Sequence, residues 1–172
     1  MPHLDAAYNL ARWLTRREHD AEDIVQEAYL RAFSAFGNFH GGDARCWLLT
    51  IVRNTCYTWL TRTRQRDAAV DSFDEAIHEV PTNASADPYV ILEQHLDQEA
   101  LRQAIEALPV EFREVLILRE FEGLSYRQIA DVANLAVGTV MSRLARARHR
   151  LAEALGAPRE RVDAKEAASE MR

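Results

Sequence analysis

The segment from Gly123 to Leu151 constrains the fold more than any other part of this chain. Its sequence, GLSYRQIADVANLAVGTVMSRLARARHRL, predicts two short helices joined by a tight turn. Ser125 can cap the first helix, because its hydroxyl accepts a hydrogen bond from the free amides of the first turn. Asn134 tolerates the left-handed backbone that such a turn needs.

The second helix of this segment is basic. Val140, Leu144 and Leu151 recur at helical spacing and are expected to pack inward. Arg143 and Arg146 are three residues apart and therefore share an outward face. A helix-turn-helix with a basic second helix is the arrangement that enters the major groove of DNA. An ordinary helical hairpin with solvated arginines is the alternative, since helical hairpins are common.

Length and composition indicate a folded, water-soluble protein. The 172 residues allow one domain of ordinary size or two small ones, and a hydrophobic content of 48% suffices for a core. No apolar run approaches the roughly 20 residues that cross a bilayer. The N-terminal sequence MPHLDAAYNLARWL lacks the uninterrupted apolar segment of a signal peptide. We therefore expect a cytoplasmic protein without membrane insertion.

The sequence contains no pattern typical of a catalytic or metal-binding site. Cys46 and Cys56 fit neither a CxxC pair nor a zinc knuckle. On one helix they would lie roughly 15 Å apart, too far for a disulfide, so both are expected to be small buried residues. No HxxxH spacing, nucleotide-binding glycine loop, GxSxG or HExxH motif occurs. We therefore predict no catalytic residue, no metal and no cofactor, which disfavours an enzyme.

Charge is distributed unevenly along the chain. The formal net charge of −6 alone argues against a DNA-binding protein. However, residues 67–122 carry three arginines and fourteen acidic residues, whereas residues 1–66 carry nine arginines and seven acidic residues. Residues 123–155 carry five arginines and two acidic residues. Two mildly basic blocks thus flank an acidic middle, and local charge is the better guide to nucleic-acid binding.

Residues 1–66 are expected to form a helical domain. A first helix is expected from His3 to Arg17, and Asp20 is expected to cap a second. A glycine-rich loop then precedes a third helix over residues 44–66. The apolar stripe of the second helix consists of Ile24, Val25, Ala28, Tyr29, Ala32, Phe33 and Phe36.

Residues 67–94 form the expected linker, an acidic stretch with two prolines and no sustained period. A helix is expected to resume near Pro88 within this linker. Residues 95–155 are expected to form a second domain, in which Phe112, Val115, Leu116, Leu118 and Phe121 line one helix before the helix-turn-helix. Residues 156–172 are expected to be a polar tail. The predicted fold is all-α: two small helical domains joined by a flexible acidic linker.

Three motifs resemble those of the extracytoplasmic-function (ECF) sigma factors of bacterial RNA polymerase. DAEDIVQEAYLRAFSAF, residues 20–36, is similar to the polymerase-binding helix of sigma region 2. FHGGDARCWLLTIVRNTCYTWL, residues 39–60, resembles the element that melts and reads the promoter. ALPVEFREVLILREFEGLSYRQIA, continuing through VGTVMSRLARARHRL, resembles region 4. The three motifs occur in the order of the family, which is more specific than a lone helix-turn-helix.

The resemblance implies binding to core RNA polymerase, at the β′ clamp coiled coil and the β flap. A polar, acidic helix face suits a basic polymerase surface. The alternative is that the first acidic residues complement the positive end of the helix dipole. The candidate polymerase-binding residues are Asp20, Glu22, Asp23, Gln26 and Glu27.

The resemblance also implies that the first domain reads the minus-ten element from the single-stranded non-template strand. Proteins hold exposed bases by stacking and in pockets. Trp47 can stack on a base, but it also lies at helical spacing with Ile51, which favours core packing at least as strongly. The candidate residues are Phe39, His40, Asp43, Arg45, Trp47, Arg53 and Asn54.

The second domain is implied to read the minus-thirty-five element as duplex DNA. Arginine to the guanine edge is the commonest specific contact, and the start of a helix can hold phosphate. Met141 stands where most relatives have lysine or arginine, which leaves the promoter consensus open. The candidate residues are Ser125, Tyr126, Arg127, Thr139, Met141, Ser142, Arg143 and Arg146.

The function implied is promoter-specific transcription initiation, for a stress or envelope-type response, under an anti-sigma factor acting in trans. The alternative is a helix-turn-helix regulator that acts without replacing the sigma subunit. The DAEDIVQE and WLLTIVRN segments argue against that alternative. The acidic linker is expected either to enter the RNA channel of polymerase or to act as a solvated tether. Neither the promoter, the inducing signal nor the anti-sigma factor can be named from the residues.

Overall fold

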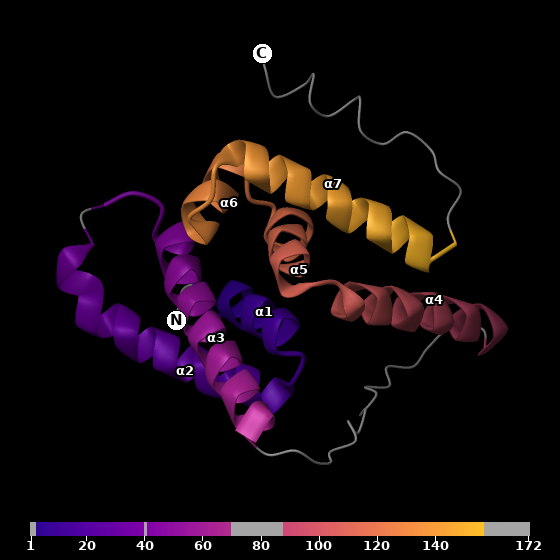
Figure 1. The fold of residues 1–172 in the computed structure, drawn as a ribbon, viewed down its shortest axis with the longest axis horizontal. Helices are drawn as coiled ribbons and strands as arrows, with labels where there is room; N and C mark the ends of the chain where they lie inside the picture. The colour runs from indigo at the N-terminus through magenta and orange to yellow at the C-terminus, as the bar shows by residue number, and fades with distance from the viewer. Residues whose placement is uncertain (1–2, 40, 70–87, 157–172) are drawn as a thin grey trace.

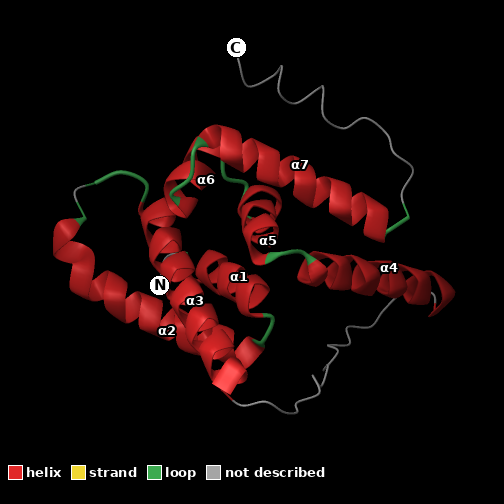
Figure 2. Ribbon diagram, in the orientation of Figure 1, coloured by secondary structure: helices red, strands yellow, loops and turns green. Residues whose placement is uncertain are grey.

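The chain is all-α in the computed structural model, which describes residues 3–39, 41–69 and 88–156. These residues form seven α-helices, a short 3-10 turn and one turn of π-helix, and contain no strand (Figure 2). The predicted fold class is thus confirmed. His40, residues 70–87 of the expected linker and residues 157–172 of the expected tail lie outside the described residues.

The first three helices pack against one another as an N-terminal bundle (Figure 1). They are α1 (Leu4–Thr15), α2 (Glu18–Ala35) and α3 (Ala44–Ala69), and the 3-10 turn η1 (Phe36–Asn38) follows α2. Small side chains let the helices approach closely, and larger apolar side chains fill the space between them. The fully buried alanines are Ala7, Ala11, Ala21 and Ala28, and the larger core residues include Leu10, Leu14, Ile24, Leu49 and Val52.

The remaining helices form a C-terminal unit. They are α4 (Pro88–Ala107), α5 (Val110–Leu116), α6 (Tyr126–Ala133) and α7 (Val137–Ala154), with the π turn η2 (Ile117–Phe121) extending α5. Glu122 N–H donates to Ile117 O across this turn at 3.1 Å, five residues back along the chain. The core of this unit lies between α5, α6 and α7 and includes Val115, Leu118, Ile129, Val140 and Leu144.

The helix-turn-helix forms as the sequence predicts. Ser125 Oγ accepts from Gln128 N–H at 3.3 Å, and Gln128 Oε1 accepts from Ser125 N–H at 2.9 Å, which makes a reciprocal capping box. Asn134 adopts a left-handed backbone with φ of 53°. The two helices α6 and α7 are therefore held at a turn of fixed geometry.

Two expectations for the N-terminal bundle are wrong. Asp20 does not cap α2, which begins at Glu18 after an N-cap at Arg17 that makes no side-chain bond. A left-handed Arg16, with φ of 65°, ends α1 so tightly that the next helix starts earlier than expected. Phe33 and Phe36 do not join the core, because the narrower stripe of Ile24, Val25, Ala28 and Ala32 already fills it; their exposed fractions are 85% and 65%.

The N-terminal bundle and the C-terminal unit lie against each other. Helix α6 packs on α3, and α5 and η2 pack on α1 (Figure 1). Phe121, expected in the core of its own domain, is instead half-exposed, and its ring centroid lies 5.4 Å from that of Trp13 in α1. We call this boundary the seam; across it Asn9, Asp43, Arg45, Arg53 and Tyr57 meet Glu114, Glu122 and Gln128.

Candidate nucleic-acid interface

The expected polymerase-binding residues lie along one helix and are open to solvent, apart from the half-buried Asp20. Glu22, Asp23, Gln26 and Glu27 are all exposed on α2. Asp23 lies 3.9 Å from His19, and Glu27 forms an ion pair with Arg31 on the same helix. Such exposed pairs contribute little to stability, so the face is free to exchange them for a partner's charges.

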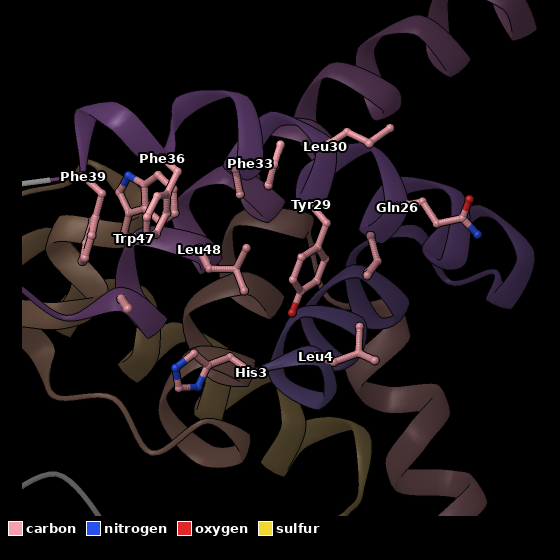
Figure 3. Close-up of a pocket in the computed structure, with 13 residues that line it drawn as sticks. His3, Leu4, Gln26, Tyr29, Leu30, Phe33, Phe36, Phe39, Trp47 and Leu48 are labelled. Carbon is pink, nitrogen blue, oxygen red and sulfur yellow. The ribbon is translucent and has the colours of Figure 1, made fainter. Parts of the chain in front are cut away.

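An apolar groove of about 740 Å³ opens beside this acidic face (Figure 3). Phe36, Phe39 and Trp47 gather at one end of it, and Leu4, Tyr29 and Leu30 line the other. The ring centroids of Phe39 and Trp47 are 5.1 Å apart, so Trp47 is half-buried in an aromatic cluster. Exposed phenylalanines around a groove mark a surface that binds an apolar partner.

Asp43 fixes the start of α3. Its Oδ1 accepts from the backbone N–H groups of Arg45 and Cys46, at 3.0 and 3.2 Å, and its Oδ2 accepts from the Cys46 thiol at 3.2 Å. The Cys46 thiol and amide hold the pKa of Asp43 below its ordinary value. Gln128 Nε2 of α6 also donates to Oδ2, at 2.8 Å. Asp43 therefore serves as a helix cap and a contact across the seam.

Arg45 is held by the C-terminal unit. It donates one bond to the carbonyl oxygen of Glu122 at 2.9 Å and forms an ion pair with the Glu122 carboxylate. The other oxygen of this carboxylate accepts from Asn9 Nδ2 at 2.6 Å. The Glu122 side chain is thereby buried between α1 and α3.

Arg53, eight residues further along α3, is held in the same way. It forms an ion pair with Glu114, a fully buried residue of α5. Tyr57 O–H donates to the second Glu114 oxygen at 2.8 Å, and the Arg53 guanidinium lies 4.4 Å from the centre of the Tyr57 ring. Burial and the Glu114 charge raise the pKa of Tyr57, so this hydroxyl stays a donor. Asn54, the remaining minus-ten candidate on α3, is exposed beside Arg53.

Arg113 joins the ends of two helices. Its guanidinium donates to the carbonyl oxygen of Leu108, just beyond α4, at 3.1 Å, and to that of Leu14 in α1 at 3.4 Å. Burial, reinforced by the charge of Arg16, lowers the pKa of Arg113 to about 10, so it is still a cation at neutral pH. A cation stabilises the negative C-terminal ends of helices.

The candidate DNA-binding residues of the helix-turn-helix differ in their exposure to solvent. Arg127, Met141, Ser142 and Arg146 are exposed, whereas Thr139 and Arg143 are half-buried. Tyr126 lies under the Arg119 guanidinium, 4.8 Å from ring centre to carbon.

Further along α7, intramolecular partners occupy the arginines. Arg148 pairs with Glu120 at 2.8 Å, and the Arg150 guanidinium lies 5.1 Å from the centre of the Phe112 ring. Arg146 forms no ion pair with any residue of the described ranges 3–39, 41–69 and 88–156. Arg146 is therefore available to a ligand, while Arg148 and Arg150 support their own unit.

Sequence reasoning missed three charged residues that the structure places in the interior. Arg113, Glu114 and Glu122 are buried within or beside α5 and η2. The signal for them is the run FREVLILREFE, in which charges interrupt a segment that is otherwise apolar on every face. Buried charges are rarely tolerated unless they are paired, so such a run indicates partners elsewhere in the chain.

None of the described helices is both long and apolar enough to span a membrane. Within residues 3–39, 41–69 and 88–156 no three metal-ligating side chains gather at one place.

Two protein-family models match this chain. Residues 1–66 match the model of Sigma-70 region 2, and residues 98–151 match that of Sigma-70, region 4. The ECF RNA polymerase sigma factor SigE of Mycolicibacterium smegmatis is 33% identical over 153 residues, which cover 89% of this chain and 58% of SigE. The sigma-H factor of Pseudomonas aeruginosa is 37% identical over 152 residues, covering 83% of this chain and 78% of the relative.

Solved structures of sigma factors share the fold. The sigma factor RpoE of Bartonella quintana, in complex with the anti-sigma factor NepR, matches with a TM-score of 0.75 and 30% identity over 91% of this chain and 93% of RpoE. CnrH, in complex with the cytosolic domain of CnrY, matches with a TM-score of 0.62 and 26% identity over 91% of this chain and 84% of CnrH. The chain therefore belongs to the extracytoplasmic-function sigma factors of RNA polymerase, which are transcription initiation factors.

Proposed function

We propose that this chain binds core RNA polymerase through the acidic face of α2 and directs initiation at a specific promoter. Residues 1–66 would read the minus-ten element and residues 95–155 the minus-thirty-five element, with residues 67–94 as the linker. We place this activity in the cytoplasm, in a stress or envelope-type response and without chemistry of its own. The observation that carries the proposal is the capped helix-turn-helix, which presents an exposed Arg146 that has no ion pair to any described residue.

Transcription with purified core polymerase tests this function. On a library of genomic promoters, core enzyme with this protein is expected to start at discrete sites. Gln26→Arg, on the acidic face of α2, is expected to abolish most of this activity, because it opposes a basic surface with a new positive charge. Gln103→Arg, an equivalent change at an exposed glutamine of α4, is the matched control. Transcripts identical to those from core enzyme alone would contradict the proposal.

We also propose an anti-sigma factor as the partner of the apolar groove. The relatives RpoE and CnrH are held in complexes with NepR and with the cytosolic domain of CnrY. An amphipathic helix suits the groove, because its apolar residues can cover the exposed Leu30, Phe33 and Phe36. A cognate anti-sigma factor is expected to bind Phe33→Ser at least ten times more weakly than the parent chain, about 1.4 kcal/mol.

A further inference from the structure

We propose that a cavity lined by four arginines binds a nucleoside triphosphate, with the phosphates on the arginines and the base against Trp59. This arginine cavity has a volume of about 420 Å³ and lies where the end of α1, the second half of α3 and the junction of α4 with α5 meet. Small-molecule sites in proteins usually have volumes of about 300–1,000 Å³. None of the described candidate residues for promoter or polymerase binding lines it, so the inference goes beyond the proposed function and does not depend on it.

All charged side chains that line the arginine cavity, among the described residues, are positive. Arg16 and Arg17 come from the turn between α1 and α2, Arg64 from α3 and Arg113 from α5. The first three are exposed, and none of them forms an ion pair within residues 3–39, 41–69 and 88–156. A ligand with several negative charges would therefore meet cations for which no carboxylate in these ranges competes.

Arg113 supplies the observation that points most directly to a ligand. Arg113 is 2% exposed, and its Nη groups donate to backbone carbonyl oxygens, including those of Leu108 at 3.1 Å and Leu14 at 3.4 Å. Among the buried side-chain nitrogen and oxygen atoms of the described residues, only Nε of Arg113 lacks a hydrogen-bond partner. A buried donor without an acceptor is unfavourable, and a phosphate oxygen in the cavity would accept from it in a charge-assisted bond.

The charges around Arg113 also favour an anion. Burial, followed by the charge of Arg16, lowers the pKa of Arg113 to about 10. The charges of Glu106 and Glu111 act in the opposite direction, but Glu106 already pairs with Arg102 at 2.8 Å. A phosphate group between Arg16 and Arg113 would add an attraction to each guanidinium where the two now repel each other.

The opposite wall of the arginine cavity suits a nucleobase. The half-buried Trp59 lines it together with the apolar side chains of Leu60, Pro109 and Val110. Bases stack favourably on aromatic side chains, and such stacking tolerates different bases. Arginines beside an aromatic wall therefore fit a nucleotide better than an inorganic polyphosphate, and they do not select one base.

Calorimetric titration of the full chain with ATP, in the absence of magnesium, tests the site. Arg16→Asn and Arg64→Gln are each expected to weaken ATP binding by about fivefold or more, because each removes a charge-assisted contact with phosphate. Arg16 has a left-handed backbone with φ of 65°, which asparagine tolerates well, so Arg16→Asn removes the charge and keeps the turn.

Arg62→Gln is the matched control. Arg62 is another exposed arginine of α3, but it does not line the arginine cavity. Its ATP affinity is expected to stay within about a factor of two of the parent's, because solvent screens an exposed charge that makes no contact with the ligand. Circular dichroism checks that every variant keeps its helices.

Inorganic triphosphate separates the contribution of the base from that of the phosphates. Trp59→Leu is expected to weaken ATP binding by about fivefold or more and to leave binding of inorganic triphosphate unchanged. Inorganic triphosphate that binds the parent chain as tightly as ATP would overturn the assignment to a nucleotide.

Two results would overturn the site itself. One is the absence of ATP binding to the parent chain at millimolar concentration. The other is an equal loss of affinity in Arg62→Gln and Arg64→Gln, which would identify a general attraction between ATP and surface arginines. These titrations contain no polymerase, so failure of the proposed function appears separately, in the transcription experiment.

Discussion

The interior of the N-terminal bundle and the seam contain different kinds of side chain. Leucine, isoleucine and alanine side chains fill the bundle, whereas arginine, glutamate, tyrosine and glutamine side chains meet at the seam beside the aromatic pair Trp13 and Phe121. Burying apolar surface stabilises the folded state by about 25 cal/mol per Å², and this gain is lost when the surface is exposed to water. A buried ion pair gains little net free energy, because both charges lose their hydration. We therefore expect the apolar contacts of the bundle to be kept in every state of the protein. The polar contacts of the seam can be replaced by contacts with another partner.

Two neighbouring residues of α1 allow the contrast to be measured. Leu10 is fully buried in the bundle, while Asn9 faces Glu122 across the seam. Leu10→Ala is expected to lower the free energy of unfolding by about 2–5 kcal/mol, through lost burial and a residual cavity. Asn9→Ala is expected to cost about 0.5–1.5 kcal/mol, the net value of one hydrogen bond.

Urea unfolding followed by circular dichroism measures both variants, and Leu30→Ala, at an exposed leucine of α2, is the control for the leucine. Equal losses for Leu10→Ala and Asn9→Ala would break the comparison between bundle and seam.

A second contrast lies within α7, between Arg146, which has no ion pair to a described residue, and Arg150, which contacts Phe112. Arg146→Ala is expected to cost about 1–3 kcal/mol at one minus-thirty-five position and to flatten discrimination there. Arg150→Ala loses the contact with Phe112 and is expected to weaken all promoter variants by a smaller, equal factor. Transcription from a set of single-base promoter variants separates the two. A uniform loss for Arg146→Ala would identify it as a phosphate contact.

The smallest expected effect is the change in the free energy of unfolding at high pH. It arises from the thiols of Cys46 and Cys56, which lie on the seam side of α3. Burial, followed by the hydrogen bond to Asp43 for Cys46 and the charge of Glu114 for Cys56, raises each pKa from 9.0 to about 12. Unfolded thiols ionise near pH 9 and the folded ones only near pH 12. The free energy of unfolding is therefore expected to fall as pH rises across this interval.

At pH 8 both folded thiols are protonated, so a disulfide reagent is expected to react slowly with the parent chain. Glu114→Gln is expected to speed its reaction with Cys56, and Glu120→Gln is not. Fast reaction of both thiols in the parent chain would show that the seam does not shield α3.

Local features of this fold were predictable from the sequence. The Ser125 cap, the left-handed Asn134 and the inward Val140 and Leu144 all depend on neighbours within a turn or two. The Asp20 cap was predicted wrongly because Arg16, unusually for a residue with a side chain, takes the left-handed turn instead.

The contacts across the seam could not be predicted from the sequence in the same way. Glu114 and Arg53 are 61 residues apart, and Arg45 and Glu122 are 77 apart, so no periodicity relates them. The residue types expected to contact DNA were also the types that pair with glutamate, and only the three-dimensional structure shows which partner is present. Phe33 and Phe36 were likewise expected in the core because apolar spacing does not reveal where a core is already full.

At the π turn η2, the number of residues matters to the fold as much as their identity. One residue more than an α-helical turn lies between Ile117 and Glu122, which sets the direction in which Phe121 and Glu122 leave the helix. Deleting a single residue there would restore α-helical register and turn both side chains by roughly 100° about the axis. Substitutions around η2 can be absorbed one side chain at a time, but an insertion or deletion would move the whole of α6 and α7 relative to α3. The position of α6 and α7 relative to α3 thus depends on the exact number of residues in η2.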